Sequence, residues 1–102
     1  MIETVTRKRI EILADTPLVR LVTAAIECCD ISGWTVLPVA SGKGREGHWH
    51  EEPVTGADKS LVLTIASESR ATNLAQELAP LLTSHGLLLT MWDVQVIRGE
   101  RF

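Results

Sequence analysis

The sequence predicts an α+β protein with the ferredoxin-like βαββαβ order, in which two helices cover one face of a four-stranded antiparallel sheet. Three observations predict this class. Four segments have the apolar pattern of strands, two have apolar residues at helical spacing, and the six segments follow one another in that order. A chain of 102 residues has room for one domain, so we expect residues 1–102 to form a single folding unit.

The first strand and the first helix are predicted at about residues 7–13 and 17–30. Apolar residues alternate from Arg7 to Leu13, and Asp15 then offers an N-cap with Pro17 in the first helical turn. Cys28 and Cys29 are neighbours in this helix, where a structural disulfide is implausible, and we expect both to be buried. The predicted apolar stripe consists of Leu18, Leu21, Val22, Ala25, Ile26 and Cys29.

From residue 33 onward the sequence predicts strands at about residues 33–40, 60–66 and 87–97. A second helix is predicted between the last two strands. Pro38 lacks an N–H for an internal ladder, so the second strand should lie at a sheet edge. Ser67 or Ser69 can cap the helix, Pro80 should kink or shorten it, and Gly86 marks its end. Its predicted apolar stripe consists of Leu74, Leu78, Leu81 and Leu82.

The predicted sheet is apolar on both faces, although two helices can cover only one of them. Apolar residues of one parity are Leu61, Leu63, Ile65, Leu87, Leu89 and Met91, and those of the other are Val62, Trp92, Val94 and Val96. A monomer would expose a large apolar patch, so we expect a homo-oligomer that packs through the second face. Scattered surface apolar residues are the alternative reading.

Charge and motifs exclude several classes of function. A formal net charge of −3 and a pI near 5.5 argue against general nucleic-acid binding, including a sheet of the RRM type. The beginning of the chain does not resemble a signal peptide, and no apolar run reaches the roughly 18 residues that span a bilayer, so we expect a cytoplasmic protein without membrane insertion. No set of catalytic residues is recognisable, and we do not expect an enzyme.

The segment 41–57 carries the most distinctive motif, a basic and glycine-rich stretch after the second strand. Its residues Gly42, Lys43, Gly44 and Arg45 combine a backbone free to curl around an anion with two positive charges. They therefore predict a loop that faces phosphate. An ordinary flexible turn is the alternative.

Two further kinds of residue in this segment suggest ligands or partners. His48 and His50 precede two glutamates, and imidazole with carboxylate suits Zn²⁺ or Cu²⁺, although a solvated loop is the competing interpretation. Trp49 lies in an otherwise polar stretch. It is either an anchor for a partner protein or neighbouring subunit, or a residue that packs within the loop.

The strand 33–39 followed by Ser41-Gly42-Lys43-Gly44-Arg45 resembles the second strand and T-loop base of PII signalling proteins. It is most similar to the carbon-linked PII-like group, which includes SbtB and the carboxysome-associated PII-like proteins. The resemblance implies a homotrimer that binds AMP or ADP between subunits, with bicarbonate as a further ligand. It also implies a T-loop at about 41–57 that regulates a partner such as a membrane inorganic-carbon transporter or an enzyme.

The same resemblance assigns phosphate contacts to individual residues. Gly42, Lys43, Gly44 and Arg45 match the T-loop base, while Arg98 and Arg101 match the basic residues after the last strand. The glycine-rich B-loop is missing before the last strand, which favours AMP or ADP, or cyclic AMP, over ATP. A metal-binding trimer similar to CutA, using His48 and His50, remains the alternative function.

Overall fold

The computed structural model describes residues 2–45, 47–52 and 56–97. The strands of its main sheet and its two helices are β1 (Thr4–Asp15), α1 (Val19–Cys28), β2 (Thr35–Pro38), β6 (Lys59–Ala66), α2 (Glu68–Ser84) and β7 (Leu88–Ile97). A 3₁₀ turn, η1 (Thr16–Leu18), precedes α1, and three short strands, β3 (Ser41–Gly44), β4 (Gly47–Glu52) and β5 (Gly56–Ala57), lie between β2 and β6. No helix among the described residues is long and apolar enough to cross a membrane.

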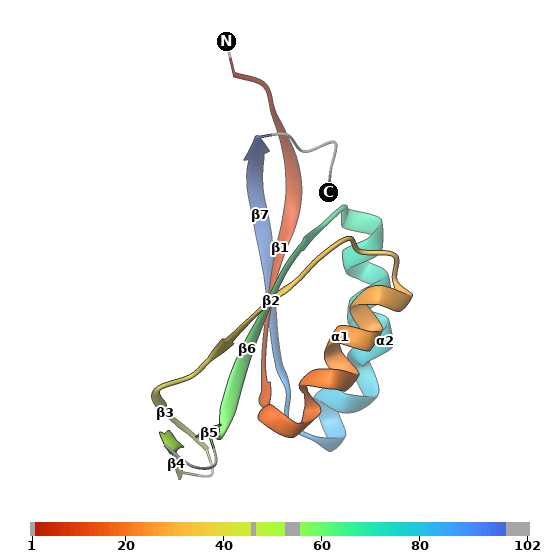
Figure 1. Ribbon diagram of the computed structural model, residues 1–102. Coiled ribbons are helices and arrows are strands. Elements are labelled where there is room, and N and C mark those ends of the chain that lie inside the picture. Colours follow the sequence, from red (N-terminus) through yellow and green to blue (C-terminus); the bar gives the residue numbers. More distant parts are fainter. Residues whose placement is uncertain (1, 46, 53–55, 98–102) are drawn as a thin grey trace.

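The predicted fold class is confirmed. The main sheet has the order β2-β6-β1-β7, and every neighbouring pair in it is antiparallel. Both helices lie on one side of this sheet and leave the other side uncovered (Figure 1). β2 is an edge strand, as Pro38 predicted, and it pairs only with β6.

The core lies between the sheet and the two helices. Ile10, Ile12 and Val62 are completely buried on the face of the sheet that the helices cover, and Ile26 and Leu74 are buried on the helices. Alternation along β6 is strict, because every second residue from Ser60 to Ala66 is buried. The period of two in the strands and 3.6 in the helices therefore accounts for the body of the molecule.

Of the predictions about the helices, the Asp15 cap and the shortening at Pro80 need correction, and the Ser67 cap is confirmed. Asp15 makes no side-chain capping bond; its carboxylate instead lies 2.6 Å from the Lys59 ammonium, and α1 begins after η1. Ser67 does cap α2, since its hydroxyl accepts a hydrogen bond from the Arg70 N–H. Pro80 does not shorten α2, which continues to Ser84.

Two side chains of α1, Leu21 and Cys28, are more exposed than predicted. Leu21 is 52% exposed, although its spacing placed it on the apolar stripe. Cys28 is exposed and Cys29 is half-buried, so the expectation that both are buried was wrong for Cys28. Burial raises the pKa of the Cys29 thiol above its usual value, with a smaller contribution from Glu77.

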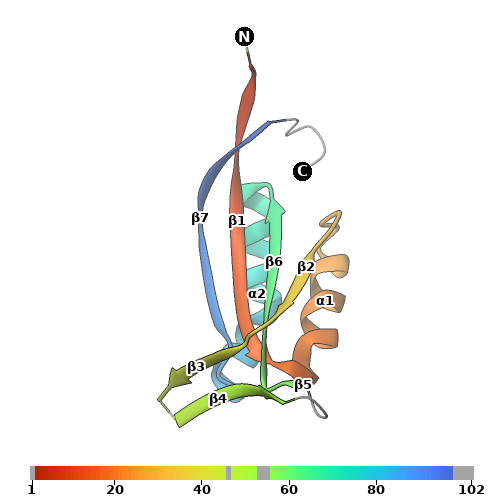
Figure 2. The same ribbon diagram turned by 60° about the vertical axis from the view of Figure 1, so that its left-hand side comes forward.

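The segment 41–57 was expected to be a loop, but the described part of it forms strands. β3 and β4 pair as an antiparallel hairpin, and β5 pairs with the end of β4. This second sheet extends from one end of the main sheet, close to the end of β1 (Figure 2). We refer to β3 and β4, residues 41–44 and 47–52, as the hairpin.

Candidate functional site

The hairpin carries most of the candidate residues, and its register divides them between two faces. Lys43 pairs with His48 and Gly42 pairs with Trp49, so each pair shares a face of the hairpin. Lys43 and His48 are exposed, whereas Trp49 is half-buried. The glycines and the tryptophan thus lie on one face, and the basic side chains lie on the other.

Trp49 packs flat on the backbone of β3, which explains the two glycines. A Cβ atom on Gly42 would lie 2.4 Å from Cζ3 of the Trp49 ring, and one on Gly44 would lie 3.0 Å from Cζ2. The backbone at both glycines is extended, and neither has a positive φ. The expected curl around an anion is therefore absent from this conformation, and Gly42 and Gly44 form a seat for the indole.

Lys59, the first residue of β6, joins the hairpin to the body. Its ammonium lies 2.6 Å from the Asp15 carboxylate and 5.4 Å from the centre of the Trp49 ring, a cation–π distance. The sequence reasoning missed this residue. A lysine that begins an otherwise apolar strand, across from an acidic residue at the end of the first strand, was the available signal.

Hydrogen bonds hold the base of the hairpin in place. The Val39 N–H donates to the Lys59 carbonyl, and the Glu51 N–H donates to the Ala40 carbonyl, at 3.0 and 3.1 Å. At the end of β1, the Thr16 hydroxyl donates to the Ala57 carbonyl at 2.6 Å. The hairpin therefore emerges from β2 in a defined direction.

His50 is held by carboxylates and not by a metal-ligand set. Its Nε2 lies 2.5 Å from Glu52 Oε1, and its backbone N–H donates to Asp58 Oδ2 at 3.0 Å. Among the described residues, no group of three or more His, Cys, Asp or Glu side chains could hold a metal ion. The arrangement of His48 and His50 therefore gives the metal-site hypothesis no support.

Of the four cations predicted to contact phosphate, the structure describes two. Lys43 and Arg45 are exposed on β3 and just after it. Arg98 and Arg101 lie outside the described residues, after the end of β7. Since Ile97 pairs with Thr4, β7 ends at the end of the sheet opposite the hairpin, as Figure 1 shows.

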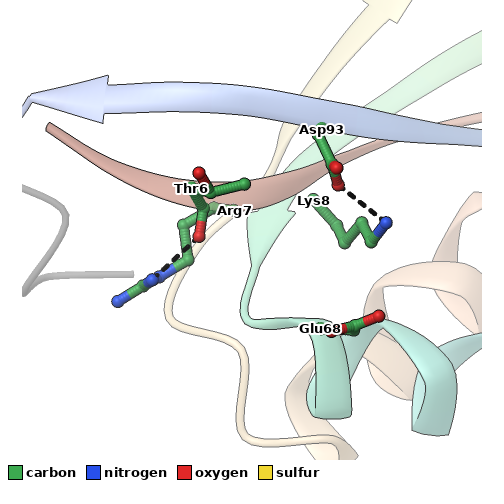
Figure 3. Close-up of a pocket in the computed structure, with 5 residues that line it drawn as sticks. All are labelled: Thr6, Arg7, Lys8, Glu68 and Asp93. Atoms are coloured by element: carbon green, nitrogen blue, oxygen red, sulfur yellow. Dashed lines mark hydrogen bonds and ion pairs between the residues drawn. The ribbon is translucent and has the colours of Figure 1, made fainter.

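A separate polar pocket lies beside the first turn of α2. Its lining consists of Thr6, Arg7, Lys8, Glu68 and Asp93 (Figure 3). The Lys8 ammonium lies 2.7 Å from the Asp93 carboxylate. This hydrogen bond, helped by the negative charges of Asp93 and Glu68 and opposed by partial burial, raises the pKa of Lys8 above 10.5.

One known protein family matches nearly the whole length of the chain. The family model of the nitrogen regulatory protein P-II matches residues 7–101. No curated protein matches the sequence. Solved structures, by contrast, match it over the complete fold.

Three solved structures illustrate this likeness. CPII, a nitrogen regulatory PII-like protein from Thiomonas intermedia K12 bound to ADP, AMP and bicarbonate, has a TM-score of 0.91 at 21% identity, over 100% of this chain and 98% of that one. A PII-like signaling protein from Thermus thermophilus has a TM-score of 0.79 at 22% identity, over 98% of each chain. The GlnK–ATP complex of B. subtilis has a TM-score of 0.63 at 8% identity, over 87% of this chain and 82% of that one.

At these identities the structural matches establish the fold, and the family model adds the sequence pattern that runs through it. The order of the strands, the two helices on one face and the excursion between β2 and β6 all fall within the matched range. The chain therefore belongs to the nitrogen regulatory protein P-II family.

Proposed function

We propose that this protein is a PII-like regulator that binds AMP or ADP between the subunits of a homotrimer and signals through the segment 41–57. The family match over residues 7–101 is the observation that carries this proposal. The projecting hairpin within this segment, which a few contacts hold to the body, supports a T-loop role for it. Regulation, not catalysis, is the activity proposed.

The phosphate contacts are assigned to the exposed cations of the hairpin. Lys43 and Arg45 are available to a ligand because neither is involved in the seat of Trp49. Gly42 and Gly44 act indirectly in this proposal, since they set the position of β3 by accommodating the indole. A ligand that draws Lys43 and Arg45 toward itself would alter how the hairpin lies on the body.

Chain geometry supports a site shared between subunits. Pro38, just before the hairpin, lies in the same row as Ser60 and Ala14, whereas Ile97 lies beside Thr4. Ten residues of β1 separate these rows, or about 33 Å at 3.3 Å per residue. The four residues from Ile97 to Arg101 span at most about 14 Å, so a phosphate held by both these arginines and a hairpin would lie between two subunits.

The connection between α2 and β7 bears on the choice of nucleotide. α2 ends at Ser84 and β7 begins at Leu88, so only three residues link them and there is no glycine-rich phosphate loop. We therefore propose AMP or ADP as the main ligands, with cyclic AMP and ATP as weaker candidates. Bicarbonate is proposed as a co-ligand because CPII, which has the same fold, binds it with ADP and AMP.

The regulated partner is proposed to be an inorganic-carbon transporter in the membrane or an enzyme, contacted by the segment 41–57. Trp49 would take part in that contact only after leaving its seat on Gly42 and Gly44. AMP and ADP are intracellular ligands, so the proposal places the protein in the cytoplasm.

Isothermal titration calorimetry tests the proposal. We expect AMP and ADP to bind with one site per chain, and bicarbonate to change the affinity. Lys43→Ala should weaken nucleotide binding about 10–100-fold, because it removes a charge-assisted hydrogen bond of about 1.5–3 kcal/mol. Arg20→Ala, at an exposed position on α1 outside the hairpin, is the matched control and should leave the affinity unchanged.

Two results would test the proposed function and the proposed role of Lys43 separately. No heat with any of AMP, ADP, ATP or cyclic AMP would refute nucleotide sensing. Tight binding that is identical in Lys43→Ala and the unaltered protein would keep the function but refute the role of Lys43.

A further inference from the structure

The face of the sheet that the helices leave open is mostly apolar, and β1 carries its charged residues near the middle of the sheet. Arg7, Arg9 and Glu11 alternate along β1 and therefore share one side, and Arg9 and Glu11 are the two nearest the middle of the strand. Their register neighbours are mostly apolar: Arg9 lies between Ile65 and Trp92, and Glu11 lies between Leu63 and Thr90. The apolar remainder of the face includes Leu13, Leu37, Leu61, Leu63, Ile65, Leu88 and Trp92.

The two charges already interact within one chain. Arg9 Nε lies 3.6 Å from Glu11 Oε2, and the Arg9 guanidinium lies 5.9 Å from the centre of the Trp92 ring. The side chains of Arg9 and Glu11 are 36% and 28% exposed, although they lie at the middle of the sheet. Any surface that covers this face therefore removes both charges from water together.

We propose that Arg9 and Glu11 form the polar centre of the contact between copies of this chain, and that assembly requires both charges. This proposal rests on the homotrimer proposed above. Arg9 and Glu11 carry opposite charges on this face, so identical copies can satisfy each other's charges. A nucleotide site completed by a neighbour's chain end requires the same kind of contact between copies.

The physical basis is the cost of an unpaired charge away from water. Removing one member of a buried ion pair leaves the other uncompensated, whereas replacing both by apolar side chains of similar volume is often neutral or stabilising. An exposed ion pair behaves differently, because water and salt screen it and its loss has little effect. The two situations give opposite predictions for assembly.

Sedimentation equilibrium of the full chain with Arg9→Met, Glu11→Leu and both together tests this inference. Each single variant should raise the dissociation constant of the oligomer at least tenfold, and the double variant should return to within about threefold of the unaltered protein. Arg70→Met is the matched control, since it removes the exposed Arg70–Asp30 pair on the helix side. That control should assemble normally.

The outcomes distinguish this inference from the proposed function. Normal assembly of both single variants, beside a trimeric unaltered protein, would overturn the role of the charges and leave the trimer intact. A double variant as weak as the two single effects combined would also overturn it, because the residues would then act independently. An unaltered protein that stays monomeric would overturn the trimer and the inference together. Far-UV circular dichroism shows whether each variant is folded.

Discussion

The body and the hairpin of this protein are stabilised in different ways. The body buries apolar side chains between a sheet and two helices, and Ile10, Ile12 and Leu74 have no exposed surface at all. The hairpin has one half-buried aromatic side chain, Trp49, on a glycine seat, and it is joined to the body by Lys59 and a few backbone hydrogen bonds. Many apolar contacts together stabilise the body, whereas the conformation of the hairpin depends on a few single residues.

This difference suits a protein that must keep one shape while part of it responds to a ligand. Segments that move in regulation have low local stability, so they can open without unfolding the core. The position of the hairpin at one end of the sheet, away from the two helices, provides that separation (Figures 1 and 2). Substitutions in the two regions should therefore have separable effects.

The largest effect is expected from truncation in the core. Leu74→Ala should lower the free energy of unfolding by about 2–5 kcal/mol, because it removes a completely buried side chain of α2 and leaves a cavity. Leu21→Ala is the matched control on α1, where the leucine is 52% exposed, and should cost less than about 1 kcal/mol. Denaturant unfolding measures both. Equal losses would mean that Leu21 is covered in solution.

The next largest effect is expected in the hairpin alone. Gly42→Ala places a Cβ atom 2.4 Å from the Trp49 ring, so the indole must leave its seat, at a local cost of about 1–3 kcal/mol. Limited proteolysis should then cut residues 41–52 faster, while the unfolding midpoint of the body stays close to that of the unaltered protein. Gly33→Ala, which meets no atom within 4 Å, should change neither. Unaltered proteolysis in Gly42→Ala would refute the seat.

A smaller effect is expected at the joint between the two regions. Lys59→Met keeps most of the side chain but loses the ion pair with Asp15 and the charge over Trp49, which are together worth about 0.5–2 kcal/mol. Lys59→Arg should preserve both interactions. Tryptophan fluorescence should shift in the first variant and not in the second. A matching shift in both would assign the effect to packing instead of charge.

The smallest effect is expected at the polar edge of the body, and it depends on pH. The pKa of Lys8 is raised by its hydrogen bond to Asp93, so the pair stabilises the folded state fully below about pH 10.5 and loses this contribution as pH rises through the raised value. Lys8→Met should be less stable than the unaltered protein by a constant amount between pH 7 and pH 10. The difference should shrink above pH 10.5, and a constant difference up to pH 12 would contradict the assignment.

The sequence was a good guide to the body and a poor guide to the hairpin. Periodicity located the four strands of the main sheet and both helices, and the single missing N–H of Pro38 predicted the edge strand. These predictions succeeded because periodicity repeats many times along an element and the missing N–H is a property of a single residue. Leu21 was misplaced because spacing identifies a stripe but not how far the neighbouring elements cover it.

The hairpin could not be predicted because its geometry depends on one contact between residues seven apart. Gly42 was interpreted by its conformational freedom, whereas the structure uses its lack of a side chain, so that Trp49 can lie against the backbone. Packing within the segment was one of two interpretations of Trp49, and nothing in a single sequence chooses between them. Lys59 was missed because its partners, Asp15 and Trp49, lie on other elements.

Amide hydrogen exchange in residues 41–52, with and without ADP and bicarbonate, tests the central claim most directly. A nucleotide-responsive hairpin on a constant body predicts a saturable change in exchange of these residues, with little change in the buried residues of β1 and β6. Identical exchange throughout the chain at millimolar ADP and bicarbonate would contradict the account.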